Sequence, residues 1–136
     1  MPDGYGGLTW TNVRWLTEPN GPVGSGLGNS VVSAPNVAFN VCCLTASISS
    51  LTPFNLISGF FTGAWNDGLQ VTVTGLNGNT TVCTVTFSVS TTGPTFELLN
   101  VNGVTSVTFL GSGGTHNPAL VPTGTNFGMD NLTVAE

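Results

Sequence analysis

The chain has 136 residues, of which only 5% are charged; one is Lys or Arg, and the net charge is −5. A typical soluble domain is about 25% charged. This composition excludes nucleic acid as a partner, because phosphate binding needs Lys and Arg, and it excludes anionic membranes for the same reason. It also leaves few groups for catalysis, so we expect a non-enzyme without a cofactor. The expected partners are neutral polysaccharide or copies of the chain itself.

Runs rich in Val, Thr and Phe alternate with clusters of Gly, Asn, Pro and Ser, which predicts strands and no helix. No apolar run is long enough to span a membrane. In chain order, we expect strands at Leu8–Trp15, Val37–Cys43, Ala46–Ser50, Phe60–Trp65, Leu69–Thr74, Thr81–Val89, Thr95–Val101, Val104–Phe109 and Phe127–Val134. Gly-rich loops are expected at Gly21–Asn29 and Gly111–Thr125. The pattern predicts one all-β domain over residues 1–136, an antiparallel β-sandwich of the jelly-roll kind.

Three turn signals join these strands. Asn77-Gly78 lies between two alternating runs and predicts a hairpin, because this pair accepts the positive φ of a type I′ turn. Asn102-Gly103 predicts a second hairpin, and Asn66-Asp67-Gly68 a third that joins Trp65 to Leu69. In such a turn the Asp67 side chain is expected to bond to nearby backbone rather than to take part in catalysis.

Period-two alternation assigns the strand faces. The residues expected to point inward are Leu69, Val71, Val73, Val85, Phe87, Val89, Val107 and Phe109. Their Thr and Ser neighbours then point outward, which suits exposed strands and is also compatible with stacking on another sheet or on a sugar lattice.

Four aromatic residues are candidates for glycan binding, because a flat ring can stack on a sugar face: Tyr5, Trp10, Trp15 and Trp65. Burial in the core is the alternative for each of them. Trp10 and Trp15 have opposite parity, so a regular strand would bury at most one.

No catalytic constellation is visible in the remaining residues. Glu97 and Glu18 have no partner in the sequence, and His116 is the only histidine. The spacing Gly-x-Ser-x-Gly, which marks a nucleophile elbow, is absent from the chain.

Motifs along the whole chain resemble exported proteins of the PEP-CTERM type and related secreted bacterial and fungal proteins. The main ones are Gly4-Tyr5-Gly6-Gly7-Leu8-Thr9-Trp10, Ala64-Trp65-Asn66-Asp67-Gly68-Leu69 and Met129-Asp130-Asn131-Leu132-Thr133-Val134. The resemblance implies a galactose-binding-like or carbohydrate-module-like jelly roll that is secreted and lies outside the cell or on its surface. The start, Met1-Pro2-Asp3-Gly4, has no signal-peptide character, so we expect a mature or trimmed form or another export route.

The resemblance has two further implications. Its members carry a Phe-Asp-Asp-Leu strand before the Gly-Tyr-Gly-Gly motif, and here only Met1-Pro2-Asp3 stands there. If that strand is missing, an open sheet edge would invite pairing with another copy; a truncated sequence is the alternative. In calcium-bearing jelly rolls a late Asp is often a ligand, which makes Asp130 a calcium candidate with Asp3 as its substitute partner. The alternative for Asp130-Asn131 is a β-bulge.

The chain has three cysteines, and an odd number leaves one unpaired in an oxidising compartment. Cys43 and Cys83 share parity with inward residues, which predicts a buried Cys43–Cys83 disulfide with Cys42 outside. A Cys42–Cys83 bridge or three reduced thiols are the alternatives. Asn79 and Asn131 begin Asn-x-Thr acceptor sequences for glycosylation in a eukaryotic source.

Two functions fit these observations. The first is a secreted structural protein that self-associates, into filaments or a surface layer. The second is a carbohydrate-binding module that uses exposed aromatic side chains.

Overall fold

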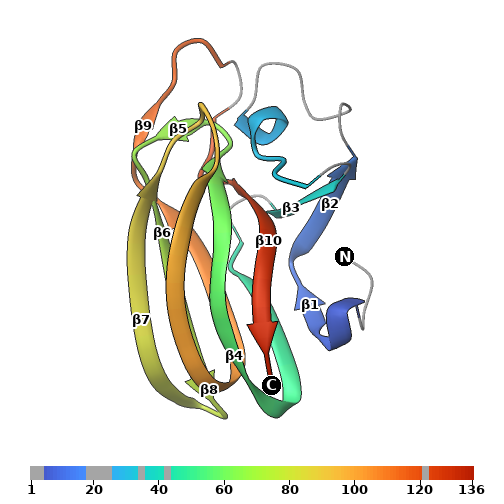
Figure 1. Cartoon of the computed structure of the whole chain (residues 1–136). Helices are drawn as coiled ribbons and strands as arrows, with labels where there is room; N and C mark the ends of the chain where they lie inside the picture. Colours follow the sequence, from blue (N-terminus) through green and yellow to red (C-terminus); the bar gives the residue numbers. More distant parts are fainter. Residues whose placement is uncertain (1–4, 18–25, 34–35, 42–43, 121–122) are drawn as a thin grey trace.

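The structure is a computed structural model that describes residues 5–17, 26–33, 36–41, 44–120 and 123–136. It is an antiparallel β-sandwich, as the sequence predicts (Figure 1). The strands are β1 (Thr9–Thr11), β2 (Val13–Thr17), β3 (Asn36–Asn40), β4 (Ala46–Gly63), β5 (Asn66–Asp67), β6 (Leu69–Asn77), β7 (Thr80–Val89), β8 (Thr95–Ser112), β9 (Thr115–His116) and β10 (Phe127–Ala135). Two short 3-10 turns, η1 (Tyr5–Gly7) and η2 (Gly26–Asn29), complete it. No helix in the described part is long and apolar enough to cross a membrane.

Two long strands, β4 and β8, fold back and contribute to both layers. They pair along their whole length, from Ala46 opposite Phe109 to Phe61 opposite Thr95. In a straight ladder Phe61 and Phe109 would lie about 50 Å apart, yet their ring centroids are 6.2 Å apart. Both strands therefore reverse direction, at the lower end in Figure 1, where the ladder register shifts.

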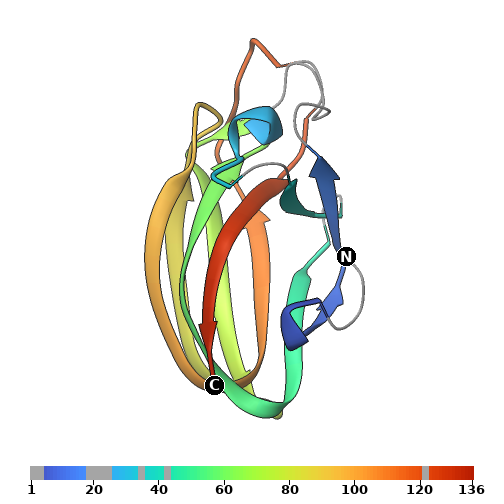
Figure 2. The ribbon, with the colours of Figure 1, turned by 45° about the vertical axis from the view of Figure 1, so that its right-hand side comes forward.

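Each half of the folded pair belongs to one layer. The first layer contains β2, β3, β10, residues 54–63 of β4 and residues 95–101 of β8. The second contains β1, residues 46–49 of β4, residues 104–112 of β8, β6 and β7. In Figures 1 and 2, β1 and β2 lie on the side of the sandwich opposite β7.

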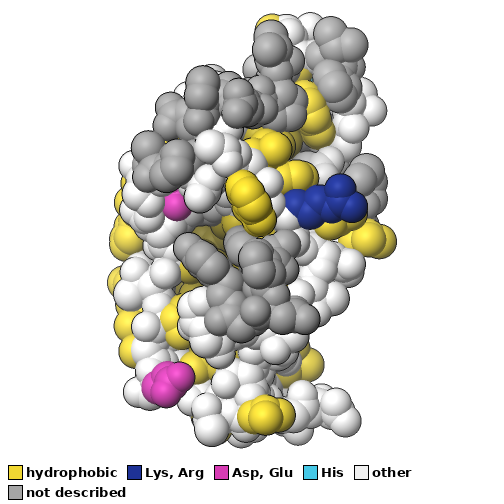
Figure 3. Space-filling model, turned by 90° about the vertical axis from the view of Figure 1, so that its right-hand side faces the viewer, with side chains coloured by type: hydrophobic (Ala, Val, Ile, Leu, Met, Phe, Trp, Pro, Cys, Tyr) yellow, Lys and Arg dark blue, Asp and Glu magenta, His cyan; other side chains and the backbone are white. Residues whose placement is uncertain are grey.

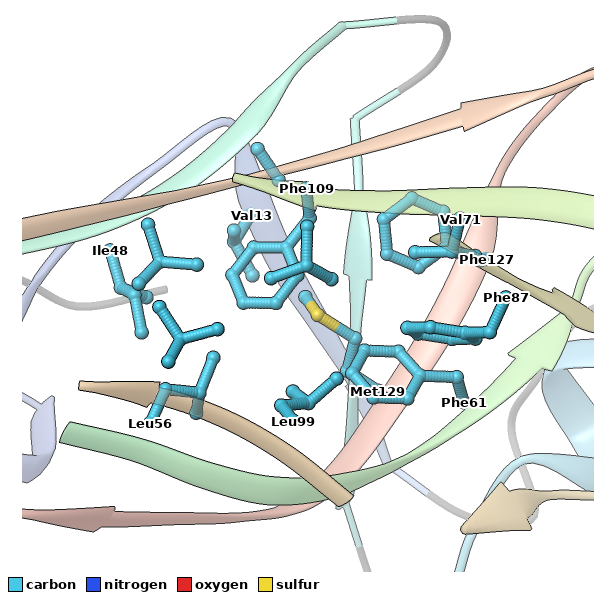
Figure 4. Packing of buried hydrophobic residues seen from close by; sticks show 14 of the residues in the cluster. Val13, Ile48, Leu56, Phe61, Val71, Phe87, Leu99, Phe109, Phe127 and Met129 are labelled. Atoms are coloured by element: carbon cyan, nitrogen blue, oxygen red, sulfur yellow. The ribbon is translucent and has the colours of Figure 1, made fainter. Parts of the chain in front are cut away.

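The core lies between the two layers. Phe61 of the first layer packs against Phe87 of the second, with ring centroids 4.8 Å apart. Aliphatic side chains and Met129 fill the space around them (Figure 4). Of the residues predicted to point inward, Val85 is partly buried and the others are buried. This agreement follows from the pleat, which alternates side chains between the faces of each strand.

The strand boundaries differ from the predicted ones where the chain bends. The predicted break between Ser50 and Phe60 is not a loop, because residues 46–63 form one strand with a corner. The predicted strand Leu8–Trp15 is two strands, divided at Asn12, which has a positive φ of 57°. Two short pieces, β5 and β9, were not predicted as strands and form a separate two-stranded sheet.

The three turns have different outcomes. The β6–β7 hairpin is confirmed, and its two turn residues are Gly78 and Asn79. Only Gly78 has a positive φ, which is the type II′ arrangement and not the predicted type I′. The predicted hairpin at Asn102-Gly103 is wrong. Gly103 has the expected positive φ, but the segments on its two sides pair with β4 and not with each other. The predicted hairpin at Asn66-Asp67-Gly68 is also wrong. The strands on its two sides, β4 and β6, do not pair with each other, and each of them pairs with β8.

Candidate functional site

The four predicted aromatic residues lie on separate elements. Trp10, on β1, packs against the core, and Trp65 is partly buried just beyond the end of β4. Tyr5 lies in η1, and its side chain is outside the described residues. Trp15, on β2, is the most exposed described aromatic residue of the four, with 50% of its surface accessible. Among the three candidates whose side chains the structure describes, Trp15 alone has a half-exposed ring.

Trp15 has polar neighbours on its own face of the sheet. It has the same parity as Val13, which is buried, but it lies on an edge strand and is half exposed. Thr17 follows two residues later on the same face, opposite Asn36 of β3. The Thr17 hydroxyl donates a hydrogen bond to Asn36 Oδ1 at 3.0 Å. We call Trp15, Thr17 and Asn36 the Trp15 platform.

The Trp15 platform combines an apolar plane with hydrogen-bonding groups. Its bond to Thr17 uses the Asn36 Oδ1 atom, so the Nδ2 group of this exposed side chain keeps its donors. The Thr17 oxygen keeps lone pairs that accept. Figure 3 shows the side of the molecule on which β1 and β2 lie in Figure 1, a mostly uncharged surface with hydrophobic side chains beside its one basic patch. A ring beside uncharged donors and acceptors suits a neutral, polyhydroxylated ligand.

A second exposed aromatic group lies on the outer face of the first layer. Phe60 of β4 and Phe96 of β8 are opposite each other, with ring centroids 5.2 Å apart at an interplanar angle of 61°. Phe96 and Leu98 are 54% and 60% exposed. Sequence reasoning missed this group because it assigned no face to residues 95–101. Their alternation of Thr, Phe, Glu and Leu is the signal that was available.

The outer face of the second layer is built from hydroxyl groups. One row crosses five neighbouring strands in register and consists of Thr11, Ser47, Thr108, Thr74 and Thr84. The row beside it on β6 and β7 contains Thr72 and Thr86, whose hydroxyl oxygens are 3.4 Å apart. Gln70 Nε2 donates to the Ser88 hydroxyl at 2.6 Å. None of the strand segments in this layer carries a charged residue, so the face offers hydrogen bonds without charge.

Asp67 has a structural role, but its partners are not the nearby backbone that its turn position predicts; they are Ser90 and Thr91, 23 and 24 residues away in the sequence. Its Oδ1 accepts hydrogen bonds from the Thr91 backbone N–H at 2.8 Å, the Thr91 hydroxyl at 2.9 Å and the Ser90 hydroxyl at 3.1 Å. These bonds, led by the one from the Thr91 backbone, hold the pKa of the Asp67 carboxyl below its usual value. Asp67 thus fastens β5 to the segment that follows β7 at one end of the sandwich.

The Asp130 carboxylate also binds the chain itself. Its Oδ2 accepts the N–H groups of Val32 and Ser33 at 2.7 and 2.9 Å, and its Oδ1 accepts that of Asn131 at 2.8 Å. Among the described residues no group of three acidic, His or Cys side chains comes together, and Asp3 lies outside them. Calcium at Asp130 stays a prediction with no support from this geometry. The β-bulge is confirmed by the register shift after Asp130.

The Cys43–Cys83 disulfide prediction is wrong. The Cys83 thiol is free, and Cys42 and Cys43 lie outside the described residues. Cys83 is on the outermost strand, β7, opposite Gly75. Val41 and Thr45, on either side of the other two cysteines, are bonded to Asn12 between β1 and β2. Shared parity identified the face of Cys83 but carries no information about distance across the sheet.

The two glycosylation candidates are both exposed. Asn79 is in the β6–β7 turn, and Asn131 is in the β10 bulge with a positive φ of 48°. Asn131 Oδ1 also accepts the Ser33 hydroxyl at 2.6 Å, so Asn79 is the less encumbered of the two. Their modification stays a prediction.

Comparison with known proteins gives a structural likeness. No protein-family model matches the chain, and no curated protein matches it. A similar solved structure is the carbohydrate-binding module TmCBM61 in complex with β-1,4-galactotriose, with a TM-score of 0.52 and 10% sequence identity. The match covers 99% of this chain and 95% of that one. The chain therefore shares the β-sandwich fold of this non-catalytic module over its whole length.

Proposed function

We propose that the protein is a non-catalytic carbohydrate-binding module for a neutral glycan and acts outside the cell. The observation that carries the proposal is the half-exposed Trp15 ring beside the uncharged Thr17–Asn36 pair. Sugar rings present apolar C–H faces and equatorial hydroxyls, and both kinds of surface have a counterpart on this platform. The fold shared with a module solved with galactotriose is consistent with this role.

Binding to the Trp15 platform is tested by removing the ring. We expect retention on an immobilised neutral polysaccharide, with β-1,4-galactan first among the probes because the similar module was solved with β-1,4-galactotriose. Trp15→Ala should weaken binding about thirtyfold or more, since truncating a central aromatic anchor costs about 2 kcal/mol or more. Trp15→Phe keeps a smaller apolar plane, so its affinity should lie between those of the wild type and Trp15→Ala. Affinity gels and isothermal titration calorimetry measure these differences.

The matched control is Phe96→Ala, which removes an aromatic ring of similar exposure from the outer face of the first layer. It should leave binding unchanged. Loss of binding in Phe96→Ala but not in Trp15→Ala would move the site to the Phe60–Phe96 pair. If the wild-type protein binds none of a broad panel of neutral polysaccharides, the proposed function is wrong.

A further inference from the structure

The two layers of the sandwich end in four outermost strand segments that have a free edge among the described residues. They are β1, β2, residues 95–101 of β8, and β7, each of which pairs on one side only. A free edge carries unpaired N–H and C=O groups and can pair with another chain. Natural sheets prevent this by short edge strands, charged side chains, proline or bulges.

Three of these edges have such protection. β1 is only three residues long. β2 carries Arg14, the one basic residue, and residues 95–101 carry Glu97 and directly follow Pro94.

β7 lacks protection over most of its length. It has ten residues, with no charged residue and no proline. Its single irregularity is at Val82, where Leu76 opposes Thr81 and Gly75 opposes Cys83. From Cys83 to Val89 the strand pairs with β6 without a shift. This seven-residue stretch is rich in β-branched residues, which favour extended backbone, and lies at the side of the sandwich in Figure 1.

We propose that β7 is the docking edge for a second copy of this chain, which adds its own β7 antiparallel through residues 83–89. Antiparallel pairing of identical strands is two-fold symmetric, so it uses up both edges and forms a closed dimer, not a filament. The other copy is the fitting occupant because an uncharged edge does not repel itself. The outward residues Thr84, Thr86 and Ser88 would also extend the hydroxyl rows of the second layer across the dimer.

The first test is oligomeric state as a function of concentration. We expect analytical ultracentrifugation of the wild-type chain to show a monomer–dimer equilibrium with no larger species. Thr86→Lys places a charge at the centre of residues 83–89, where it would face the same Lys of the second copy. The two like charges should prevent pairing and leave a monomer. The matched control, Thr52→Lys, makes the same change at an exposed position in the β4 corner and should leave the dimer intact. A wild-type chain that is monomeric at millimolar concentration overturns the proposal, as does dissociation by both variants alike.

A second test does not depend on destabilising the strand. In a chain whose native cysteines are replaced by Ser, single Cys residues are introduced at Thr84, Thr86 or Ser88. Under mild oxidation, the position nearest the two-fold axis should give a disulfide-linked dimer, and Thr52→Cys should not. Absence of crosslinking at all three β7 positions would also overturn the proposal. Neither readout involves the Trp15 platform, so the result is independent of glycan binding.

Discussion

At the residue scale, the carboxylates of Asp67 and Asp130 act as acceptors that hold distant segments of the chain together. Asp67 and Asp130 each take several hydrogen bonds from backbone N–H and hydroxyl groups of segments far away in the sequence. With so few charged residues, a carboxylate is the strongest acceptor available, and a charge-assisted bond is stronger than a neutral one. The Asp67 side chain therefore holds Thr91 against β5, and the Asp130 side chain holds residues 32–33 against β10.

Asp67→Asn should lower the free energy of unfolding by about 1 kcal/mol at pH 7, because the bonds from Thr91 and Ser90 lose their charged acceptor. The folded pKa of Asp67 is lowered, so the unfolded chain binds the proton more readily. The stabilisation is complete above the unfolded pKa of about 4 and is lost as pH falls through the lower folded pKa. Urea unfolding at several pH values should show the difference between Asp67→Asn and wild type shrinking below about pH 4.

Glu136→Gln, at an exposed position, serves as the control for the Asp67 measurement and should have no effect at neutral pH. A difference between Asp67→Asn and wild type that stays constant down to low pH would show that the carboxylate charge does not contribute.

At the element scale, the corner of β8 is the feature on which both layers depend. Gly103 has a φ of 66°, and its N–H donates to Asn55 Oδ1 of the neighbouring corner in β4 at 2.9 Å. Nothing lies within 4 Å of the position that a Cβ would occupy. The reason for glycine here is therefore backbone conformation and not space.

Gly103→Ala should destabilise the protein by about 1–2 kcal/mol, the cost of a left-handed conformation for an L-residue. Gly93→Ala is the matched control, since its position also has open space but no positive φ. Chemical denaturation of the two variants compares them directly. Equal losses in both would mean that the corner does not require positive φ.

The sequence predicted strand interiors better than strand connections. Alternation identified Val71, Val73, Phe87 and Phe109 as core residues because it reports on the local pleat. It could not distinguish a hairpin at Asn102-Gly103 from a corner, since positive φ is needed in both and the choice depends on β4, distant in sequence.

The candidate site was predicted in part, for a related reason. Trp15 was among the aromatic residues named, but the expectation from parity assumed one regular strand and does not carry across the break at Asn12; on β2, Trp15 shares the parity of buried Val13. The Thr17–Asn36 partner pair could not be foreseen because it needs the β2–β3 register. The Cys43–Cys83 bridge was predicted from parity alone, which reports the face of a strand and not a pairing, and the Cys83 thiol is free.

At the scale of the whole molecule, the low charge should make ligand binding insensitive to salt. The Trp15 platform has no charged member, and the second layer has none. Binding of a neutral glycan should therefore change less than twofold between about 0.05 M and about 0.5 M NaCl, a range over which exposed charges become strongly screened. Titration calorimetry at the two salt concentrations provides the measurement. A steep decrease with salt would point to Arg14, on the other face of β2, as a ligand contact.

The fold-back of β4 and β8 also governs how the protein folds. Each layer contains half of both strands, so neither sheet is complete until residues 95–112 have joined residues 46–63. These contacts close a long loop, and contacts between residues distant in sequence are slow to form. No part of the chain before residue 95 contains a finished sheet, and the two layers cannot separate without breaking the same two strands. We therefore expect neither layer to form before residues 95–112 are made, and the two layers to unfold as one cooperative unit.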